Sequence, residues 1–233
     1  MFKLVLECNN FFKDCGFPYA FCGGNALELF LNKNIRPHSD IDIFIFEEDK
    51  KSAVEFILDK NWNIYTRMDM GISLITDSED RRLVDILTLW AIKPDCSFMK
   101  LDPINGEDNA FNYQVLSEEQ LNLDFIDIFL AQKNNVDYIC DKDKNITREL
   151  NKAILYNNDV PYLAPEIKLF FDATPRYMEL DYFKNKNQID FESTAPFLLE
   201  ESKNWLINAL EKKYPEGNKR IEQLKSIKRI LRA

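Results

Sequence analysis

Two carboxylates stand one residue apart at the start of a short apolar run. Asp40 and Asp42 flank Ile41, and apolar residues continue to Phe46. In a β-strand, residues i and i+2 point to the same face, so this spacing predicts two carboxylates side by side. Neighbouring negative charges repel each other unless a cation lies between them. Mg²⁺ fits this requirement, because proteins bind it through one or two carboxylates together with substrate phosphates.

A pair of glycines precedes these acids in the chain. Gly23 and Gly24 lie between a segment expected to be a strand (18–22) and one expected to be a helix (25–31). A glycine turn of this kind lets a phosphate approach the backbone N–H groups at a helix N-terminus. A phosphate cradle close in sequence to a metal-binding carboxylate pair predicts metal-dependent chemistry on a nucleotide.

These residues and three later segments resemble a known family. The glycine pair and the octapeptide RPHSDIDI (36–43) resemble the GG…SDxD motif of the polymerase β-like nucleotidyltransferase superfamily. The segments PYLAPEI (161–167), DFE (190–192) and WLINAL (205–210) resemble the C-terminal half of the aminoglycoside/lincosamide nucleotidyltransferase-like proteins. Both halves occur in the expected order, and together they cover most of the chain.

The resemblance implies a fold and a division into domains. The fold would be α+β, with a nucleotidyltransferase-like mixed sheet and flanking helices, followed by a helical C-terminal half. The nucleotidyltransferase domain would span residues 1–150 and the helical domain residues 151–233.

The resemblance also implies a reaction. Such an enzyme moves a nucleoside monophosphate, here AMP from ATP, onto a hydroxyl of a small molecule. The acceptor would be an aminoglycoside- or lincosamide-like antibiotic, so the activity would confer antibiotic resistance. Asp40, Asp42 and a third acid would hold Mg²⁺. The phosphates of the nucleoside triphosphate would contact four residues: Gly23, Gly24, Ser39 and Arg36.

Two acids are candidates for the third carboxylate. Asp127 lies in the apolar run 125–130, and Asp85 lies in the apolar run 83–87. A buried, unpaired charge costs several kcal/mol, so either acid would need compensation, and burial does not choose between them. In the relatives that share the segment 161–167, the third acid lies on a strand that corresponds to 125–130. We therefore favour Asp127 and keep Asp85 as the second choice.

The chain departs from the family at Asp172, where relatives often carry a lysine that contacts phosphate. Lys168, Lys184 and Lys186 are possible substitutes, although a solvated surface lysine is the more common case. Glu166 follows Pro165, so it fits the start of a helix as well as contact with the acceptor. The sequence leaves both roles of Glu166 open.

Two alternatives to small-molecule modification stay open. The chain could transfer the nucleotide to a partner protein, as antitoxin-type nucleotidyltransferases do, although those are usually shorter. It could also be a degenerate, non-catalytic nucleotide-binding protein. The departure at Asp172 favours the second alternative, whereas the intact glycine pair and acids argue against it.

Composition narrows the class of protein. The net charge of −9 lacks the basic footprint of a nucleic-acid binder and suits a cationic acceptor. Five cysteines without a CxxC pair predict reduced thiols, and with no signal peptide we expect a cytoplasmic protein. No apolar run is long enough to span a membrane. The single histidine, His38, excludes zinc sites built on several histidines and is expected to shape the turn before residue 40. The oligomeric state is not predicted.

The pattern of apolar residues predicts further elements. Periodicity indicates strands over 40–46, 63–66, 71–76 and 83–90, and helices over 2–13, 51–60, 165–173, 195–213 and 219–231. Residues 93–116 are rich in Pro, Asp, Asn and Gly, and we expect a long insertion made of loops.

Overall fold

The chain forms two compact units. The computed structural model describes residues 2–174, 181–228 and 230. The first unit consists of Met1–Phe21 and Pro37–Gln132, and the second of Cys22–Arg36 and Lys133–Ala233. This division differs from the expected boundary at residue 150. It lies earlier in the chain, and the glycine-containing segment before the carboxylates belongs with the C-terminal part.

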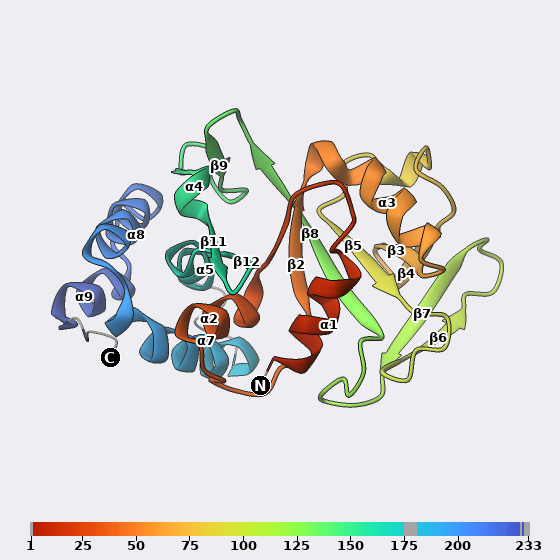
Figure 1. The fold of residues 1–233 in the computed structure, drawn as a ribbon, viewed down its shortest axis with the longest axis horizontal. Helices are drawn as coiled ribbons and strands as arrows, with labels where there is room; N and C mark the ends of the chain where they lie inside the picture. Colours follow the sequence, from red (N-terminus) through yellow and green to blue (C-terminus); the bar gives the residue numbers. More distant parts are fainter. Residues whose placement is uncertain (1, 175–180, 229, 231–233) are drawn as a thin grey trace. The chain divides into compact units, whose positions relative to one another are not determined.

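A mixed sheet is the centre of the first unit (Figure 1). Its strands follow the order β1-β2-β8-β5-β3-β4-β7-β6, and β2 and β8 are parallel whereas the other neighbours are antiparallel. The α+β class with a mixed sheet is therefore confirmed. The strands are β1 (Tyr19–Phe21), β2 (Asp42–Phe46), β3 (Asn63–Arg67), β4 (Ile72–Ile75), β5 (Thr88–Ile92), β6 (Met99–Pro103), β7 (Ala110–Val115) and β8 (Phe125–Lys133).

Both faces of this sheet carry apolar side chains, so β2 and β8 consist largely of apolar residues apart from Asp42, Asp127 and the polar end of β8. Helices α1 (Lys3–Phe11) and α3 (Lys50–Asp59) pack together, and the rings of Phe12 and Phe56 stack 5.7 Å apart. A separate buried cluster gathers aromatic and aliphatic residues of β3, β4, β5, β6 and β8. Its buried members are Tyr65, Ile72, Trp90, Ile92, Phe98, Met99 and Phe125. By strand register, Trp90 lies on the same face as the carboxylates discussed below.

Two predictions about the first unit are wrong. The expected loop insertion at 93–116 contains the antiparallel hairpin of β6 and β7. The expected strand at 83–90 is instead a short 3-10 helix, η2 (Arg81–Leu83), a turn, and then β5. Asp85 adopts a left-handed backbone conformation, with φ +58°, which a strand cannot contain. The apolar run is thus interrupted, and Val84 and Leu87 are exposed.

The second unit combines helices with two strand pairs, so the half expected to be helical also contains strands. Its strands form the antiparallel pairs β9–β10 and β11–β12. The latter pair is joined by Asn158 and Asp159, both at positive φ, as in two-residue hairpin turns. The strands are β9 (Asp137–Ile139), β10 (Thr147–Glu149), β11 (Ile154–Asn157) and β12 (Val160–Leu163).

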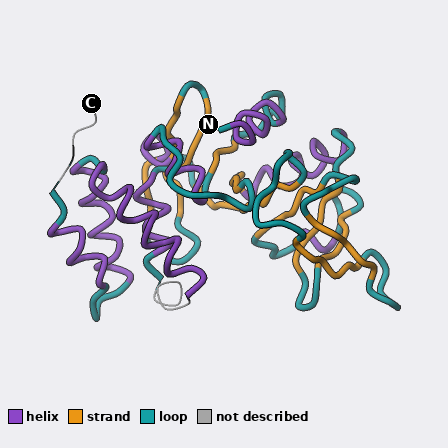
Figure 2. The backbone as a smooth tube through the Cα atoms, turned by 90° about the horizontal axis from the view of Figure 1, so that it is seen from below, coloured by secondary structure: helices purple, strands orange, loops and turns teal. Residues whose placement is uncertain are grey.

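The helices of this unit contain most of the predicted helical segments. Helices α5 and α8 pack against each other, as do α8 and α9, and Figure 2 shows the helices of the chain in purple. The helix expected to end at residue 231 ends at Ser226, and residues 229 and 231–233 lie outside the described residues. The helices are α2 (Gly23–Leu31), α4 (Leu150–Ala153), α5 (Pro165–Asp172), α7 (Asp181–Thr194), α8 (Glu200–Lys213) and α9 (Lys219–Ser226). None of the described helices has the length and apolarity needed to cross a bilayer.

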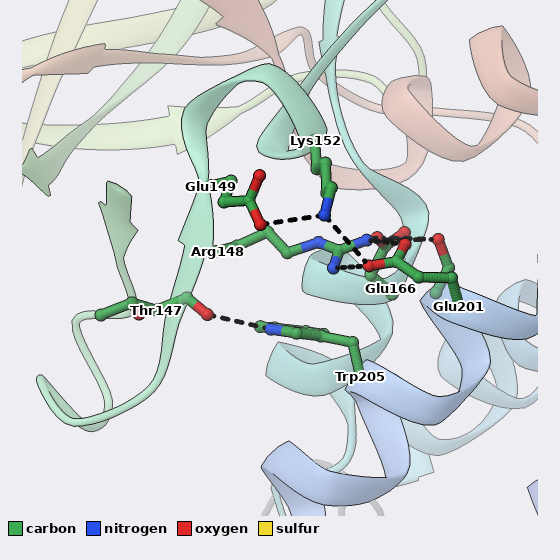
Figure 3. A network of polar contacts seen from close by, with 8 residues as sticks. Thr147, Arg148, Glu149, Lys152, Glu166, Glu201 and Trp205 are labelled. Atoms are coloured by element: carbon green, nitrogen blue, oxygen red, sulfur yellow. Dashed lines mark hydrogen bonds and ion pairs between the residues drawn. The ribbon is translucent and has the colours of Figure 1, made fainter. Parts of the chain in front are cut away.

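A buried arginine joins three elements of the second unit (Figure 3). Arg148 of β10 donates to Glu166 Oε1 of α5 at 2.6 Å, and to both carboxylate oxygens of Glu201 of α8 at 2.6 and 2.7 Å. Its guanidinium also lies over the ring of Trp205, 5.4 Å from the centroid. Burial raises the pKa of Glu166 although Arg148 opposes the rise. Arg148 therefore compensates a carboxylate that has no access to water.

We expect replacement of Arg148 to destabilise the protein strongly. Arg148→Met leaves the Glu166 carboxylate buried and unpaired, which should lower the free energy of unfolding by about 3–5 kcal/mol. Glu201→Gln is the matched control, because the Glu201 side chain is 56% exposed and its loss should cost below about 1 kcal/mol. Urea denaturation measures both. If both variants lost the same amount of stability, the buried Glu166 carboxylate would not depend on Arg148 for compensation.

Candidate active site

The parallel pairing of β2 and β8 brings two predicted site residues together. Asp42 pairs directly with Asp127, and the Asp127 amide donates to the carbonyl of Ile41 at 2.9 Å. Adjacent strands lie about 4.8 Å apart, and directly paired residues project from the same face of a sheet. The Asp42 and Asp127 carboxylates are therefore neighbours on one face. In sequence they are 85 positions apart.

Asp40 lies just before this pair rather than within the strand. The expected strand over 40–46 begins at Asp42, and Asp40 belongs to the bend that precedes it. The Ser39 hydroxyl donates to Asp40 Oδ1 at 3.1 Å. The Asp40 charge is close enough to raise the pKa of Asp127. Asp40 and Asp127 therefore interact electrostatically although they come from different segments.

The environment of Asp127 is unfavourable for a negative charge. Burial, followed by repulsion from Asp40, raises the pKa of Asp127 to about 7, against the opposing effects of Arg67 and Trp90. The Asp127 Oδ1 atom is buried and has no hydrogen-bond partner. A buried acceptor without a partner is uncommon in native proteins and indicates an absent ion, water or ligand.

The donor set suits a hard cation but does not form a complete cage. Across residues 2–174, 181–228 and 230, no three His, Cys, Asp or Glu side chains gather closely enough to hold a metal ion. The carboxylate oxygens and the unpartnered Asp127 Oδ1 are the ligand type that Mg²⁺ prefers. Since Mg²⁺ typically retains waters and binds substrate phosphates, an incomplete protein cage matches its coordination habits.

Two further residues border the carboxylates and were not found from the sequence. Trp90 of β5 lies directly opposite Asp127 in the strand register. The Arg67 guanidinium at the end of β3 lies over the Trp90 ring, 5.3 Å from the centroid. No local motif marks either residue. Only the order of β8, β5 and β3 in the sheet places them beside the acids.

In the structure, the burial argument no longer supports Asp85, the second candidate for the third carboxylate. Asp85 is exposed, and it lies in the turn between η2 and β5 rather than in an apolar strand. The turn forms because Asp80 accepts hydrogen bonds from the backbone N–H and the side chain of Arg82. An exposed acid needs no compensating cation, so the burial argument applies to Asp127 and fails for Asp85.

The glycine pair belongs to the second unit and begins helix α2 there. Gly23 adopts φ +57°, a conformation that strains residues with a side chain. The first backbone N–H groups of a helix have no partner within it, so they are available to a phosphate. Asn25, in the same first turn, has a buried Oδ1 without a hydrogen-bond partner. A strand followed by a helix is confirmed here, but the glycines lie in the first turn of α2, and Cys22 alone separates the helix from β1.

Arg36 and Lys168 of the second unit lie in a buried network of charged residues. Arg36 donates to the Asp190 carboxylate from Nε and Nη2, at 2.8 and 3.0 Å, and Asp190 is fully buried. Lys168 Nζ lies 2.5 Å from Asp172 and 3.7 Å from Asp190. The expectation that Lys168 is a solvated surface lysine is therefore wrong, because two buried acids hold it. Lys184 is exposed, as expected.

Comparisons with known proteins find similarity to solved structures at low sequence identity. No protein-family model and no curated protein matches the sequence. The crystal structure of ANT(2'')-Ia in complex with adenylyl-2''-tobramycin is similar at 10% identity and a TM-score of 0.49, over 91% of this chain and 99% of that one. A solution structure of the antibiotic-resistance factor ANT(2'')-Ia is similar at 12% identity and a TM-score of 0.47, over 91% and 92%.

A third similar structure is the lincomycin-bound crystal structure of the lincosamide antibiotic adenylyltransferase LnuA. It shares 14% identity with a TM-score of 0.46, over 80% of this chain and 95% of that one. These are proteins of the kind that the sequence motifs resemble. Similarity at this level carries no conclusion about activity, so the function proposed below is argued from the residues themselves.

The pKa of Asp127 predicts a pH-dependent stability in metal-free buffer. The unfolded chain releases this proton near pH 3.9, whereas the folded protein retains it to about pH 7. The stabilisation by the bound proton is complete below about pH 4 and is lost as pH rises through about 7. Asp127→Asn should therefore be more stable than the wild type at pH 8, by at most about 4 kcal/mol.

Urea denaturation in EDTA across pH 4 to 8 measures this difference, which should approach zero at pH 4. The exposed Asp85→Asn variant is the control, and its stability should follow that of the wild type at every pH. A constant difference between Asp127→Asn and the wild type would show that Asp127 ionises normally.

Proposed function

We propose that this protein is a Mg²⁺-dependent nucleotidyltransferase that moves AMP from ATP onto a hydroxyl of a small molecule. The observation that carries the proposal is the pairing of Asp42 with Asp127 on parallel strands, with Asp40 beside them and an unpartnered buried oxygen on Asp127. Neighbouring acids held at a cost in electrostatic energy are typical of sites that use their charge. The acceptor would be an aminoglycoside- or lincosamide-like antibiotic, as the sequence motifs imply.

The carboxylates of Asp40, Asp42 and Asp127 would hold the magnesium ion. When bound, Mg²⁺ neutralises charge on the triphosphate and on the leaving pyrophosphate. The overall charge of −9 also fits a cationic acceptor.

Asp127 would act on the acceptor. The acceptor oxygen forms a bond to the α-phosphorus, the bond between this phosphorus and the bridging oxygen breaks, and pyrophosphate leaves. The hydroxyl proton passes to Asp127. Positioning supplies much of the remaining acceleration in such transfers.

The remaining predicted residues would bind the phosphates. Gly23 and Gly24 would donate from backbone N–H groups at the start of α2, and Ser39 would donate its hydroxyl. Arg36 would contact phosphate while Asp190 fixes the orientation of its guanidinium. Lys168, paired with Asp172, is a further cation of the same unit.

We expect Asp42→Asn to lose at least about 100-fold in transfer rate, because even outer-shell changes at metal sites cost 10–100-fold. The assay incubates the protein with Mg²⁺, α-labelled ATP and a panel of aminoglycosides and lincosamides, and detects label on the acceptor. EDTA should abolish the transfer. Asp85→Asn is the matched control and should retain the wild-type rate.

The position of the label separates the proposal from its alternatives. Label on a polypeptide after addition of a cell lysate would favour a protein-modifying enzyme. ATP binding without transfer to any acceptor would favour a non-catalytic nucleotide-binding protein. Normal turnover by Asp42→Asn would refute the site assignment.

A further inference from the structure

Two buried polar atoms that lack a hydrogen-bond partner belong to directly opposite residues of strands β5 and β8. They are Nε1 of Trp90 and Oδ1 of Asp127. Trp90 is only 6% exposed. Residues directly opposite in an antiparallel pair have Cβ atoms about 5 Å apart on the same face. One atom is an obligate donor and the other an acceptor. Leaving each unsatisfied costs about 1–3 kcal/mol.

The indole ring of Trp90 is held from three sides by residues of three different strands. Tyr113 and Phe125 pack edge-on against it, with ring centroids 4.9 and 5.2 Å away. The Arg67 guanidinium lies over the ring, 5.3 Å from the centroid. These contacts prevent the ring from turning, so the direction of its N–H bond is fixed by packing.

A tryptophan used only for packing ordinarily finds a partner for its N–H group when it is buried. Trp205 in this chain does so, because its Nε1 donates to the carbonyl of Thr147 at 2.9 Å. Trp90 differs in having the nearby carboxylate as its natural acceptor. The indole N–H already lies close enough to lower the pKa of Asp127 against the effect of burial.

We propose that Trp90 is the positioning residue of the carboxylate site. Its N–H group donates to one lone pair of Asp127 Oδ1 in the working state and fixes the carboxylate plane, which leaves the other lone pairs of the carboxylate to the metal ion and the acceptor hydroxyl. Hydrogen bonds at active sites are often long without substrate and tighten in the loaded enzyme. A base held by a third group is the general arrangement for activating a nucleophile.

The hydrogen bond can be tested without any catalytic activity. The sequence contains three tryptophans, so a protein with ¹⁵N-labelled indoles has three indole N–H signals, which single Trp→Phe variants assign. At pH 8 with Mg²⁺, Asp127→Asn should move the Trp90 signal upfield, because a neutral acceptor is weaker than a carboxylate. The Trp205 signal should stay in place. Asp85→Asn should move neither signal, and an unmoved Trp90 signal in Asp127→Asn overturns the proposal.

The catalytic consequence rests on the proposed function, and a replacement of one atom tests it. Benzothienylalanine at position 90 puts sulfur in place of the N–H group and keeps the shape of the ring. We expect kcat to fall about 10–100-fold with KM unchanged, and Mg²⁺ affinity, measured by calorimetry without turnover, to fall about tenfold. The same replacement at Trp62, a buried tryptophan beside Phe11, should change none of these.

Failure of the proposed function and failure of the role proposed for Trp90 give different results. A wild-type protein that transfers no nucleotide would reject the proposed function, and the indole signal and Mg²⁺ affinity would still decide the role of Trp90. If the wild type is active and the benzothienylalanine variant at position 90 keeps its kcat and Mg²⁺ affinity, Trp90 does not position Asp127.

Discussion

The parallel pairing of β2 with β8 is the constraint on which the candidate site depends. It places Asp42 directly beside Asp127, and Asp40 follows because it lies two residues before Asp42. Apolar side chains on the opposite face of both strands fix this register, since a slip of one residue would turn the acids into the core. The hydrophobic core of the first unit therefore holds the carboxylates in place.

Concentrating negative charge on a largely apolar face is costly, and the neighbouring strands only partly offset the cost. Arg67 and Trp90 favour the ionised form of Asp127, but burial and Asp40 outweigh them. The protein thus maintains an arrangement that destabilises its own folded state at neutral pH. Such local cost is characteristic of functional sites, where a bound ion or substrate supplies the missing interactions.

In the second unit, by contrast, buried charged residues form ion pairs with opposite charges of the protein. Arg36 pairs with Asp190, Lys168 pairs with Asp172, and Arg148 pairs with Glu166. The acid at position 172, which departs from the related proteins, is stabilised by the lysine one helical turn earlier. Matched pairs of this kind involve helices α5 and α7, whereas in the first unit the buried Asp127 Oδ1 has no hydrogen-bond partner.

The features that could be predicted from the sequence are those set by residues close together in the chain. The Asp40–Asp42 spacing, the glycines before α2, and the apolar flanks of Asp127 all follow from short-range patterns. The turn at Asn158 and Asp159 also has a local signal in the sequence, because Asn and Asp tolerate positive φ. Asp85 resembled Asp127 because a single apolar run does not reveal a left-handed residue within it. The positions of Trp90 and Arg67 beside the acids depended on the order of strands, which long-range packing decides and periodicity does not encode. The tertiary structure therefore decided that Asp127 lies beside Asp42 and Asp85 in an exposed turn, and it supplied the neighbours of Asp127.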